Sequence, residues 1–296
     1  MGALAVQKIR SFNRTVTECI GALNDQFLGR ALPLGEARLL WEIGSDGAEV
    51  RALRQRLDLD SGYLSRVLRS LERKKLVRVR TSKGDRRVRR AYLTDAGLAE
   101  RAELDRRSDL AAQQILEPLS DGQRATLVAA VTEVEKLFEA AMVRFAIEDP
   151  TTPDARWCFD QYFAELDARF EAGFDPALSI SADARELTPP AGILLIARLR
   201  DRPVGCAALK FHVDAPAELK RMWITPAVRG LGLGRRLLGE MEQHAREAGV
   251  AVLRLETNRS LSEAITLYRR AGYVEVAAFN EEPYAHHWFE KHLSAE

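Results

Sequence analysis

The stretch ELKRMWITPAVRGLGLG, residues 218–234, constrains the fold of this 296-residue chain more than any other. It predicts an apolar-rich strand, a break at Pro226, and a helix that opens on the alternating glycines Gly230, Gly232 and Gly234. Glycines at such a turn remove the side chains that would keep an anion away from the backbone. The unpaired N–H groups of the helix start can then converge on one point. We therefore expect a phosphate or pyrophosphate site here.

The residues around the glycines exclude two familiar phosphate loops. A Walker A loop needs Gly-Lys-Ser/Thr after its glycines, and that tripeptide is missing. A dinucleotide-binding turn needs G-x-G-x-x-G after a strand buried on both faces. The spacing here is G-x-G-x-G, and the strand carries Glu218, Lys220 and Arg221.

The pattern R-x-x-G-x-G after a Glu-bearing strand resembles motif A of the GNAT family of N-acetyltransferases. A second block in the right order, N…A…LY…GY, resembles the family's next element and comprises Asn258, Ala264, Leu267-Tyr268 and Ala271-Gly272-Tyr273. The resemblance covers about half of the chain, from roughly residue 141 to the end. It implies an α/β fold with a mixed sheet and helices on both faces. It also implies transfer of an acetyl group from acetyl-CoA to a primary amine, most simply that of a small molecule.

The same resemblance implies roles for individual residues. Tyr268 would be the general acid that protonates the leaving thiolate, and packing is the alternative role for its ring. Glu218 matches a carboxylate that serves some members as general base, directly or through water, and pairing with Lys220 or Arg221 is its alternative role. The glycine turn and a bulge in the preceding strand would hold the cofactor, through Met222, Trp223, Ile224, Thr225, Arg229, Gly230, Leu231, Gly232, Leu233, Gly234, Arg235 and Asn258.

Charge is distributed unevenly and points to a second activity. Residues 66–90 contain 12 basic side chains against two acidic ones, Glu72 and Asp85. A solvated surface normally mixes positive and negative charges, so this concentration of positive charge favours a polyanionic partner.

Apolar spacing predicts helices over 5–28, 34–43, 49–57 and from Asp60 or Ser61 to 74, and alternation of apolar and polar residues predicts a hairpin over 76–80 and 86–94.

Helices followed by a basic hairpin form a winged helix-turn-helix, and the residues resemble the MarR family of transcriptional regulators. Asp85 and Arg87 match the family's Asp-x-Arg wing, whereas Lys75 stands where the family usually has a glycine. A left-handed helix cap at Lys75 would be strained by about 1 kcal/mol. Tyr63 could pack rather than read bases, and Arg87 could pair with Asp85. The DNA-binding residues implied are Ser61, Tyr63, Ser65, Arg66, Arg69, Lys83, Arg86, Arg87 and Arg89.

Long amphipathic helices expected over 95–117 and 120–140 resemble, with the first helix, the dimerisation bundle of MarR proteins. A homodimer would bind an inverted repeat in double-stranded DNA, and a bundle within one chain is the alternative. We expect a winged-helix and dimerisation domain over residues 1–140 and an acetyltransferase domain over 141–296.

The remaining sequence features bear on the cellular location, on metal binding and on two alternative functions. No apolar run could span a membrane, no secretion signal is recognised, and Cys19, Cys158 and Cys206 are expected to be buried thiols in the cytoplasm. No metal site is expected, because His286 and His287 would point to opposite faces of a strand. One rival function is a sensor that binds acyl-CoA without turnover. Another is acetylation of protein lysines, including the chain's own Lys74, Lys75 or Lys83.

Overall fold

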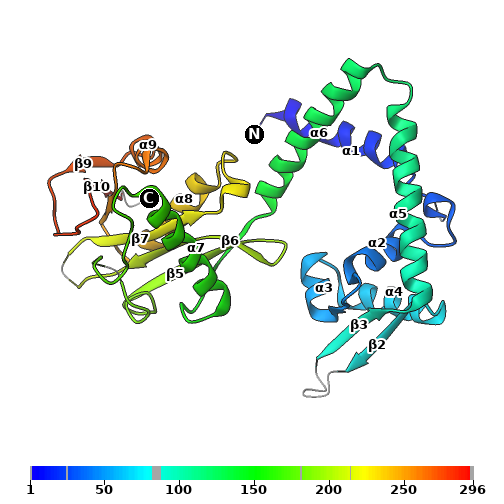
Figure 1. The fold of residues 1–296 in the computed structure, drawn as a ribbon, viewed down its shortest axis with the longest axis horizontal. Coiled ribbons are helices and arrows are strands. Elements are labelled where there is room, and N and C mark those ends of the chain that lie inside the picture. The colour runs from blue at the N-terminus through cyan, green and yellow to red at the C-terminus, as the bar shows by residue number, and fades with distance from the viewer. Residues whose placement is uncertain (1, 25, 82–87, 181, 214, 294–296) are drawn as a thin grey trace. The chain divides into compact units, whose positions relative to one another are not determined.

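The computed structural model describes residues 2–24, 26–81, 88–180, 182–213 and 215–293, and Figure 1 shows their helices and strands. The chain divides into two compact units, Met1–Ala129 and Ala130–Glu296. The hairpin residues Lys83, Arg86 and Arg87, which the sequence assigns to DNA binding, lie outside the described residues.

The first unit is mainly helical. In chain order its elements are α1 (Ala3–Cys19), a 3-10 turn (Phe27–Gly29), α2 (Leu34–Ile43), β1 (Ala48–Glu49), α3 (Val50–Arg56), α4 (Ser61–Arg73), β2 (Val77–Thr81), β3 (Arg89–Leu93), α5 (Asp95–Leu116) and the start of α6 (Asp121–Met142). The strands form an antiparallel sheet in the order β1-β3-β2. Apart from the 3-10 turn and the two-residue strand β1, this is the element order that the sequence predicts.

Helix α4 is fixed by its cap and by one apolar stripe. The Asp60 carboxylate accepts a hydrogen bond from the Tyr63 N–H and so caps the helix start. Leu64, Val67, Leu68 and Leu71, the stripe expected from their spacing, are all buried in the core of the unit. The opposite face of α4 therefore points outward.

Two predictions for the N-terminal segment are wrong. The helix expected over residues 5–28 ends at Cys19, because Gly21 takes a positive φ of 61° and the chain turns there. Cys19 is exposed rather than buried, while Cys158 and Cys206 are buried as expected and all three thiols are free.

Lys75 adopts the left-handed conformation that the family pattern reserves for glycine, with φ of 59°. Its N–H donates to the Glu72 carbonyl, and the next N–H, of Leu76, donates to the Leu71 carbonyl. These bonds end α4 in the usual glycine-type cap. The cap geometry is therefore kept, with a side chain in place of the glycine.

The second unit is built on one mixed sheet. Its elements are the rest of α6, β4 (Arg144–Ile147), α7 (Pro153–Arg169), β5 (Gly192–Leu199), β6 (Arg202–Lys210), β7 (Ala217–Ile224), a 3-10 turn (Pro226–Val228), α8 (Leu233–Glu247), β8 (Val252–Thr257), α9 (Ser262–Arg270), β9 (Val274–Val276) and β10 (His287–His292). The described strands lie in the order β4-β5-β6-β7-β8-β10-β9. The β7–β8 pair is parallel and the other neighbouring pairs are antiparallel.

Helices cover both faces of this sheet, which explains the continuous apolar run ILLI in β5. Ile193 and Leu195 belong to the core under α8, whereas Leu194 and Ile196 belong to the core under α7. A strand buried on both faces needs no alternation of apolar and polar residues. No helix among the described residues has the length and apolarity that a membrane crossing requires.

Candidate functional site

The parallel strands β7 and β8 separate soon after they meet. Their pairing comprises Ala217 with Leu253 and Glu218 with Arg254. Beyond these pairs the two strands diverge, whereas β7 stays paired with β6 on the other side through Leu219, Lys220, Trp223 and Ile224. A cleft therefore opens in the middle of the sheet, at the carboxyl end of both strands.

A β-bulge deforms β7 at the mouth of this cleft. Cys206 of β6 faces Trp223 and Ala208 faces Lys220, so two steps on β6 match three steps on β7. Arg221 takes a positive φ of 52° at this point. Such a bulge leaves one residue out of the ladder and re-aims its neighbours. The GNAT resemblance implies a bulge in this strand, and the structure has one.

The glycine turn opens α8 with unpaired backbone donors. Gly230 and Gly232 have φ of 80° and 77°, a conformation in which a side chain would be strained. Arg236 makes the first helical bond, to the Gly232 carbonyl, which leaves the N–H groups of residues 233–235 outside the helix ladder. A Cβ on either of the two glycines would enter open space rather than the protein. These features fit a pyrophosphate, which needs donors and close approach to the backbone.

The two arginines of the turn differ in their surroundings. The Arg229 guanidinium donates to both carboxylate oxygens of Glu165 and to the Ile224 carbonyl. The indole of Trp223 donates to the same carboxylate. Burial alone would raise the pKa of Glu165, but hydrogen bonds from Arg229 and Trp223 outweigh burial and lower that pKa below its usual value. Arg235, in contrast, makes no ion pair within the described part of the chain and lines the cavity beside the glycines.

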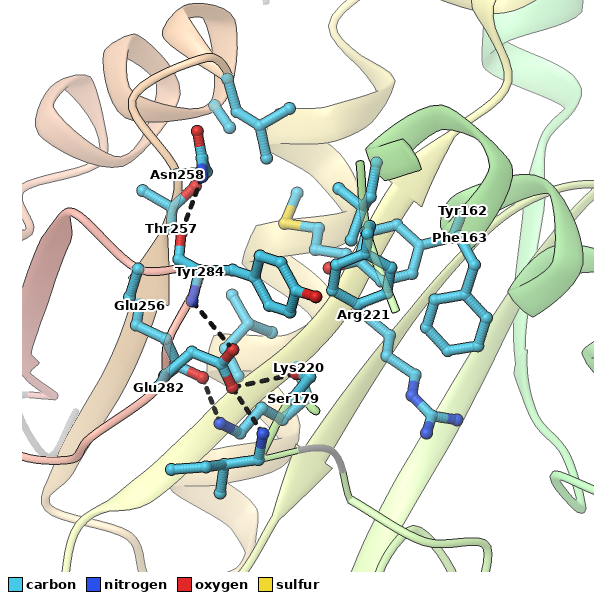
Figure 2. A pocket seen from close by; sticks show the side chains of 18 of the residues that line it. Tyr162, Phe163, Ser179, Lys220, Arg221, Glu256, Thr257, Asn258, Glu282 and Tyr284 are labelled. Carbon is cyan, nitrogen blue, oxygen red and sulfur yellow. Dashed lines mark hydrogen bonds and ion pairs between the residues drawn. The ribbon is translucent and has the colours of Figure 1, made fainter. Parts of the chain in front are cut away.

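Two cavities occupy the cleft. The donor cavity, of about 450 Å³, contains most of the residues that the sequence assigns to the cofactor, namely Met222, Trp223, Ile224, Arg229, Gly230, Gly232, Leu233, Gly234 and Arg235. The aromatic cavity, of about 110 Å³, is lined by rings and by the Glu256, Glu282 and Lys220 side chains (Figure 2). Thr225 and Leu231 line neither cavity.

The two cavities share one boundary. Tyr162, Met222 and Tyr268 line both, together with Leu166, Leu261 and Ala264. Tyr268, on α9, is 6% exposed, and its hydroxyl lies 3.8 Å from the Met222 sulfur. Burial and, to a smaller extent, the charge of Glu256 raise the pKa of Tyr268, so its phenol stays protonated at neutral pH. Tyr268 is therefore one of the residues at the boundary between the two cavities.

Glu218 is separated from Tyr268 by a chain of charges. Its carboxylate lies 2.8 Å from the Lys220 ammonium and 3.0 Å from His212 Nε2. Burial opposes ionisation, yet the charge of Lys220 lowers the pKa of Glu218 below its usual value. Lys220 also pairs with Glu256, and Glu256 lines the aromatic cavity whereas Glu218 does not. The contacts of Glu218 therefore show its alternative role, which is pairing with Lys220.

Sequence reasoning missed Glu256. Burial raises its pKa above the usual value, and the Lys220 charge offsets part of that rise. The available signal was weak: VLRLET alternates charged and apolar residues, which in an ordinary strand marks a solvent face.

Asn258 contacts the chain itself. Its Nδ2 donates to the Tyr284 carbonyl at 2.7 Å and its Oδ1 accepts from the Ser260 N–H at 2.9 Å. Asn258 lines the aromatic cavity rather than the donor cavity. In this structure its amide anchors the segment that carries Tyr284.

Comparison with known proteins identifies both units. Residues 153–273 match the model of the acetyltransferase (GNAT) family and residues 32–88 match the model of the MarR family. The IAA acetyltransferase of Azospirillum brasilense is 37% identical over 121 residues, which are 40% of this chain and 78% of that protein. The chain belongs to the GNAT acetyltransferase family. Both resemblances read from the sequence are confirmed, and with them the N-acetyltransferase class and the fold of a MarR domain followed by a GNAT domain.

Two solved structures resemble this chain over about half of its length. A Klebsiella pneumoniae protein proposed to be an acyl-CoA N-acyltransferase is 32% identical, with a TM-score of 0.43 over 52% of this chain and 99% of that chain. A GNAT family acetyltransferase from Elizabethkingia anophelis, solved with acetyl-CoA bound, is 16% identical, with a TM-score of 0.39 over 51% of this chain and 99% of that chain.

Three of the residues that the sequence predicts to contact DNA lie together in the MarR domain. Ser61, Ser65 and Arg89 line a shallow hollow between α3, α4 and β3, together with Arg51 and Arg54 of α3. Sequence reasoning missed the two α3 arginines, although they lie on the polar side of a short amphipathic helix. Their charges add to the basic stretch 66–90.

On α4, Arg66 and Arg69 point outward and are exposed. Arg66 lies over the Tyr63 ring at 6.0 Å, and the Tyr63 side chain is 39% exposed. The Tyr63 hydroxyl lies close against Gly35 of α2, because a Cβ on that glycine would come within 2.2 Å of it. Tyr63 therefore combines packing on α2 with an exposed ring edge.

The adjacent histidines of the GNAT domain take no part in either cavity. His287 Nδ1 pairs with Glu275 at 2.6 Å, and its ring stacks on Phe289. His286 is exposed and precedes the strand β10.

Proposed function

We propose that the chain is a DNA-binding regulator fused to an acetyl-CoA-dependent N-acetyltransferase that acetylates a primary amine of a small molecule. The observation that carries the catalytic part is the junction of the two cavities at Tyr268. One cavity ends on the glycine turn, which suits a pyrophosphate, and the other ends on carboxylates, which suit a cation. The family match supplies the class of reaction.

Acetyl-CoA is the expected donor and supplies an acetyl group activated as a thioester. The N–H groups of residues 233–235 and the Arg235 guanidinium would bind its pyrophosphate. Backbone groups of β7 on the side where β8 has diverged, around Met222 to Ile224, would face the pantetheine arm and the thioester oxygen. A well-placed N–H at such an oxygen contributes about 3 kcal/mol to catalysis.

Tyr268 would donate its phenolic proton to the departing sulfur. Its buried setting keeps that proton in place at neutral pH, and it lies at the boundary where the thioester and the amine must meet. Glu218 would act on the amine through water rather than directly, since Lys220 and His212 occupy its carboxylate.

A thiol-release assay tests this proposal. Acetyl-CoA is mixed with a panel of primary amines, and Tyr268→Phe is compared with the wild type. We expect turnover with at least one amine and a fall of about 10²-fold in kcat for the variant. Silence of the whole panel while acetyl-CoA still binds would favour a sensor. Acetyl-lysine formation with acetyl-CoA alone would favour self-acetylation.

DNA binding and dimerisation belong to the same proposal. The outward face of α4 and the arginines of α3 and β3 would contact the major groove and the phosphates. Helix α1 buries no residue and exposes Leu4, Val6 and Ile9, and α5 exposes Leu110 and Ile115. Apolar helix faces of this extent suit a twofold dimer, and the operator would then be an inverted repeat. A cytoplasmic location is part of this proposal.

Two measurements test the regulatory part. Light scattering should give twice the mass of the 33.1 kDa chain. Footprinting should show two protected half-sites about one helical turn apart. A monomeric mass with a single protected half-site would contradict the dimer.

A further inference from the structure

The aromatic cavity contains a buried carboxylate oxygen that the protein does not satisfy. The side chain of Glu256 is 10% exposed, and its Oε1 pairs with the Lys220 ammonium. Its Oε2 is buried and has no hydrogen-bond partner among the described residues. An oxygen of this kind carries a desolvation cost that a bound donor can remove. Glu256 lines the cavity, so its carboxylate is the acceptor that an N–H group bound beside Lys220 would meet.

The other acidic side chain of the cavity is already used by the chain. Glu282 Oε2 accepts hydrogen bonds from the Ser179 hydroxyl at 2.9 Å and from the Ile180 N–H at 2.7 Å. Its Oε1 accepts from the Tyr284 N–H at 3.3 Å. Glu282 therefore joins two loops and leaves Glu256 to meet a ligand.

The rest of the cavity wall is a chain of aromatic rings. Phe163 stacks on Phe174 with centroids 5.7 Å apart, and Phe174 lies 4.8 Å from Tyr284. Phe170 contacts both Phe174 and Tyr284 at 5.8 Å. These four rings are half-buried, so each keeps an apolar surface that a ligand could cover. In Figure 2 the charged groups of Glu256 and Lys220 lie on one side of the cavity, and the rings of Tyr162 and Phe163 lie on the other.

The size of the cavity limits what it can enclose. Its volume is about 110 Å³. An engineered cavity of about 150 Å³ in another protein holds one benzene molecule. The enclosed part of a ligand is therefore no larger than about one ring, and the remainder of a larger ligand would lie outside the enclosed space. A bulky polycation such as an aminoglycoside exceeds it.

We propose that the acetyl acceptor is a small arylalkylamine, whose ammonium donates to Glu256 Oε2 and whose ring packs against Phe163, Phe174 and Tyr284. The assignment deepens the proposed function and rests on it. The nitrogen then lies in the cavity that adjoins the donor cavity at Tyr268. The ammonium would lose one proton through water to Glu218, and the free amine would form the C–N bond to the thioester carbonyl as the C–S bond breaks and Tyr268 protonates the leaving sulfur. A polyamine has no ring to cover the aromatic wall, and its far ammonium would find the Glu282 carboxylate already hydrogen-bonded by the chain's own loops.

The test uses the full-length protein in two assays. Thiol release from acetyl-CoA is measured with benzylamine, 2-phenylethylamine, spermidine and glycine. Calorimetry measures binding of 2-phenylethylamine and of 2-phenylethanol, which has the same ring but no ammonium. Glu256→Gln removes the charge at constant shape, and Glu281→Gln is the matched control, because that carboxylate is exposed and lines neither cavity.

We expect the lowest KM with the two arylalkylamines. Glu256→Gln should raise the KM for 2-phenylethylamine by roughly 10- to 100-fold, the usual loss for a hydrogen bond to a charged group. The KM for acetyl-CoA should stay within about twofold, since Glu256 does not line the donor cavity. Phe174→Ala should also raise the amine KM, and it leaves Glu256 and Lys220 untouched should the first variant fold poorly.

Preference for spermidine or glycine, or an amine KM that neither variant changes, would overturn the assignment. If no amine releases thiol, the proposed function fails and calorimetry decides the binding question separately. Binding of 2-phenylethylamine that weakens in Glu256→Gln would then support the site. Equal affinity for the alcohol, or no binding of either compound, would refute it.

Discussion

Replacing Lys75 by glycine should stabilise the MarR domain. Lys75 is an exposed residue held at φ of 59°, and no side-chain contact of it is recorded in the described structure. A left-handed conformation costs a residue with a Cβ about 1–2 kcal/mol. Glycine also gives the unfolded chain more conformational entropy, which reduces the gain in stability by about 0.4–1 kcal/mol. The expected net gain is therefore about 0.5–1 kcal/mol.

Amide hydrogen exchange of the full-length chain is a suitable assay, because it reports on one unit at a time. The slowest amides of α4, around Leu64, Leu68 and Leu71, exchange through unfolding of their own core. Their exchange rate in Lys75→Gly should fall by roughly 2- to 5-fold, which is the same free energy expressed as a ratio.

Lys75→Ala is the control that separates geometry from charge. It removes the same positive charge from the basic stretch and keeps the Cβ, so the strain remains. We expect its exchange rates to stay at or above those of the wild type. Equal protection in the glycine and alanine variants would mean that charge repulsion, and not the left-handed cap, sets the stability. The reasoning from φ would then be refuted.

Three further outcomes are expected. Gly232→Ala should raise the KM for acetyl-CoA by about tenfold. Alanine at φ of 77° would strain the turn, and its methyl group would enter the space in front of α8. An unchanged KM in the thiol-release assay would contradict this prediction. Arg66→Ala should weaken operator binding and flatten its dependence on salt concentration in fluorescence anisotropy, because it removes an exposed positive charge that we propose contacts DNA. The pKa of Glu165 is lowered in the folded state, so its contribution to stability is present above the ordinary Glu value and is lost as the pH falls through the lowered one. Acid unfolding should therefore be shallower in Glu165→Gln than in the wild type, and identical profiles would argue against this linkage.

Local patterns predicted most of the elements because their signals lie within a few residues. Pro33 and Asp60 mark helix starts, the apolar residues of α4 repeat at helical spacing, and Gly232 begins α8 as expected. The helix end at Cys19 was harder to place, because apolar spacing continues past Gly21 toward Phe27. A single glycine is a weak stop signal on its own.

Contacts across the sheet could not be predicted in the same way. Glu165 of α7 meets Arg229 of the glycine turn, 64 positions away. That contact removes Arg229 from the free charges of the turn and leaves Arg235. The pairing of Lys220 with Glu256 likewise depends on β7 and β8 being neighbours. A family motif names the turn, but partners brought together by topology are not encoded at any fixed spacing.

The bulge in β7 explains why an alternation argument could not locate this site. Before the bulge the odd-numbered Ala217 and Leu219 face the core under α8, and after it the even-numbered Ile224 does, while Trp223 packs under α7. One extra residue inverts the order. It also lets the consecutive residues 219–222 line one cavity, which a regular strand cannot do. Beside this irregularity the Lys220 ammonium pairs with Glu256 and the Met222 sulfur lies 3.8 Å from the Tyr268 hydroxyl. The donor cavity and the aromatic cavity therefore meet where the strand between them is irregular.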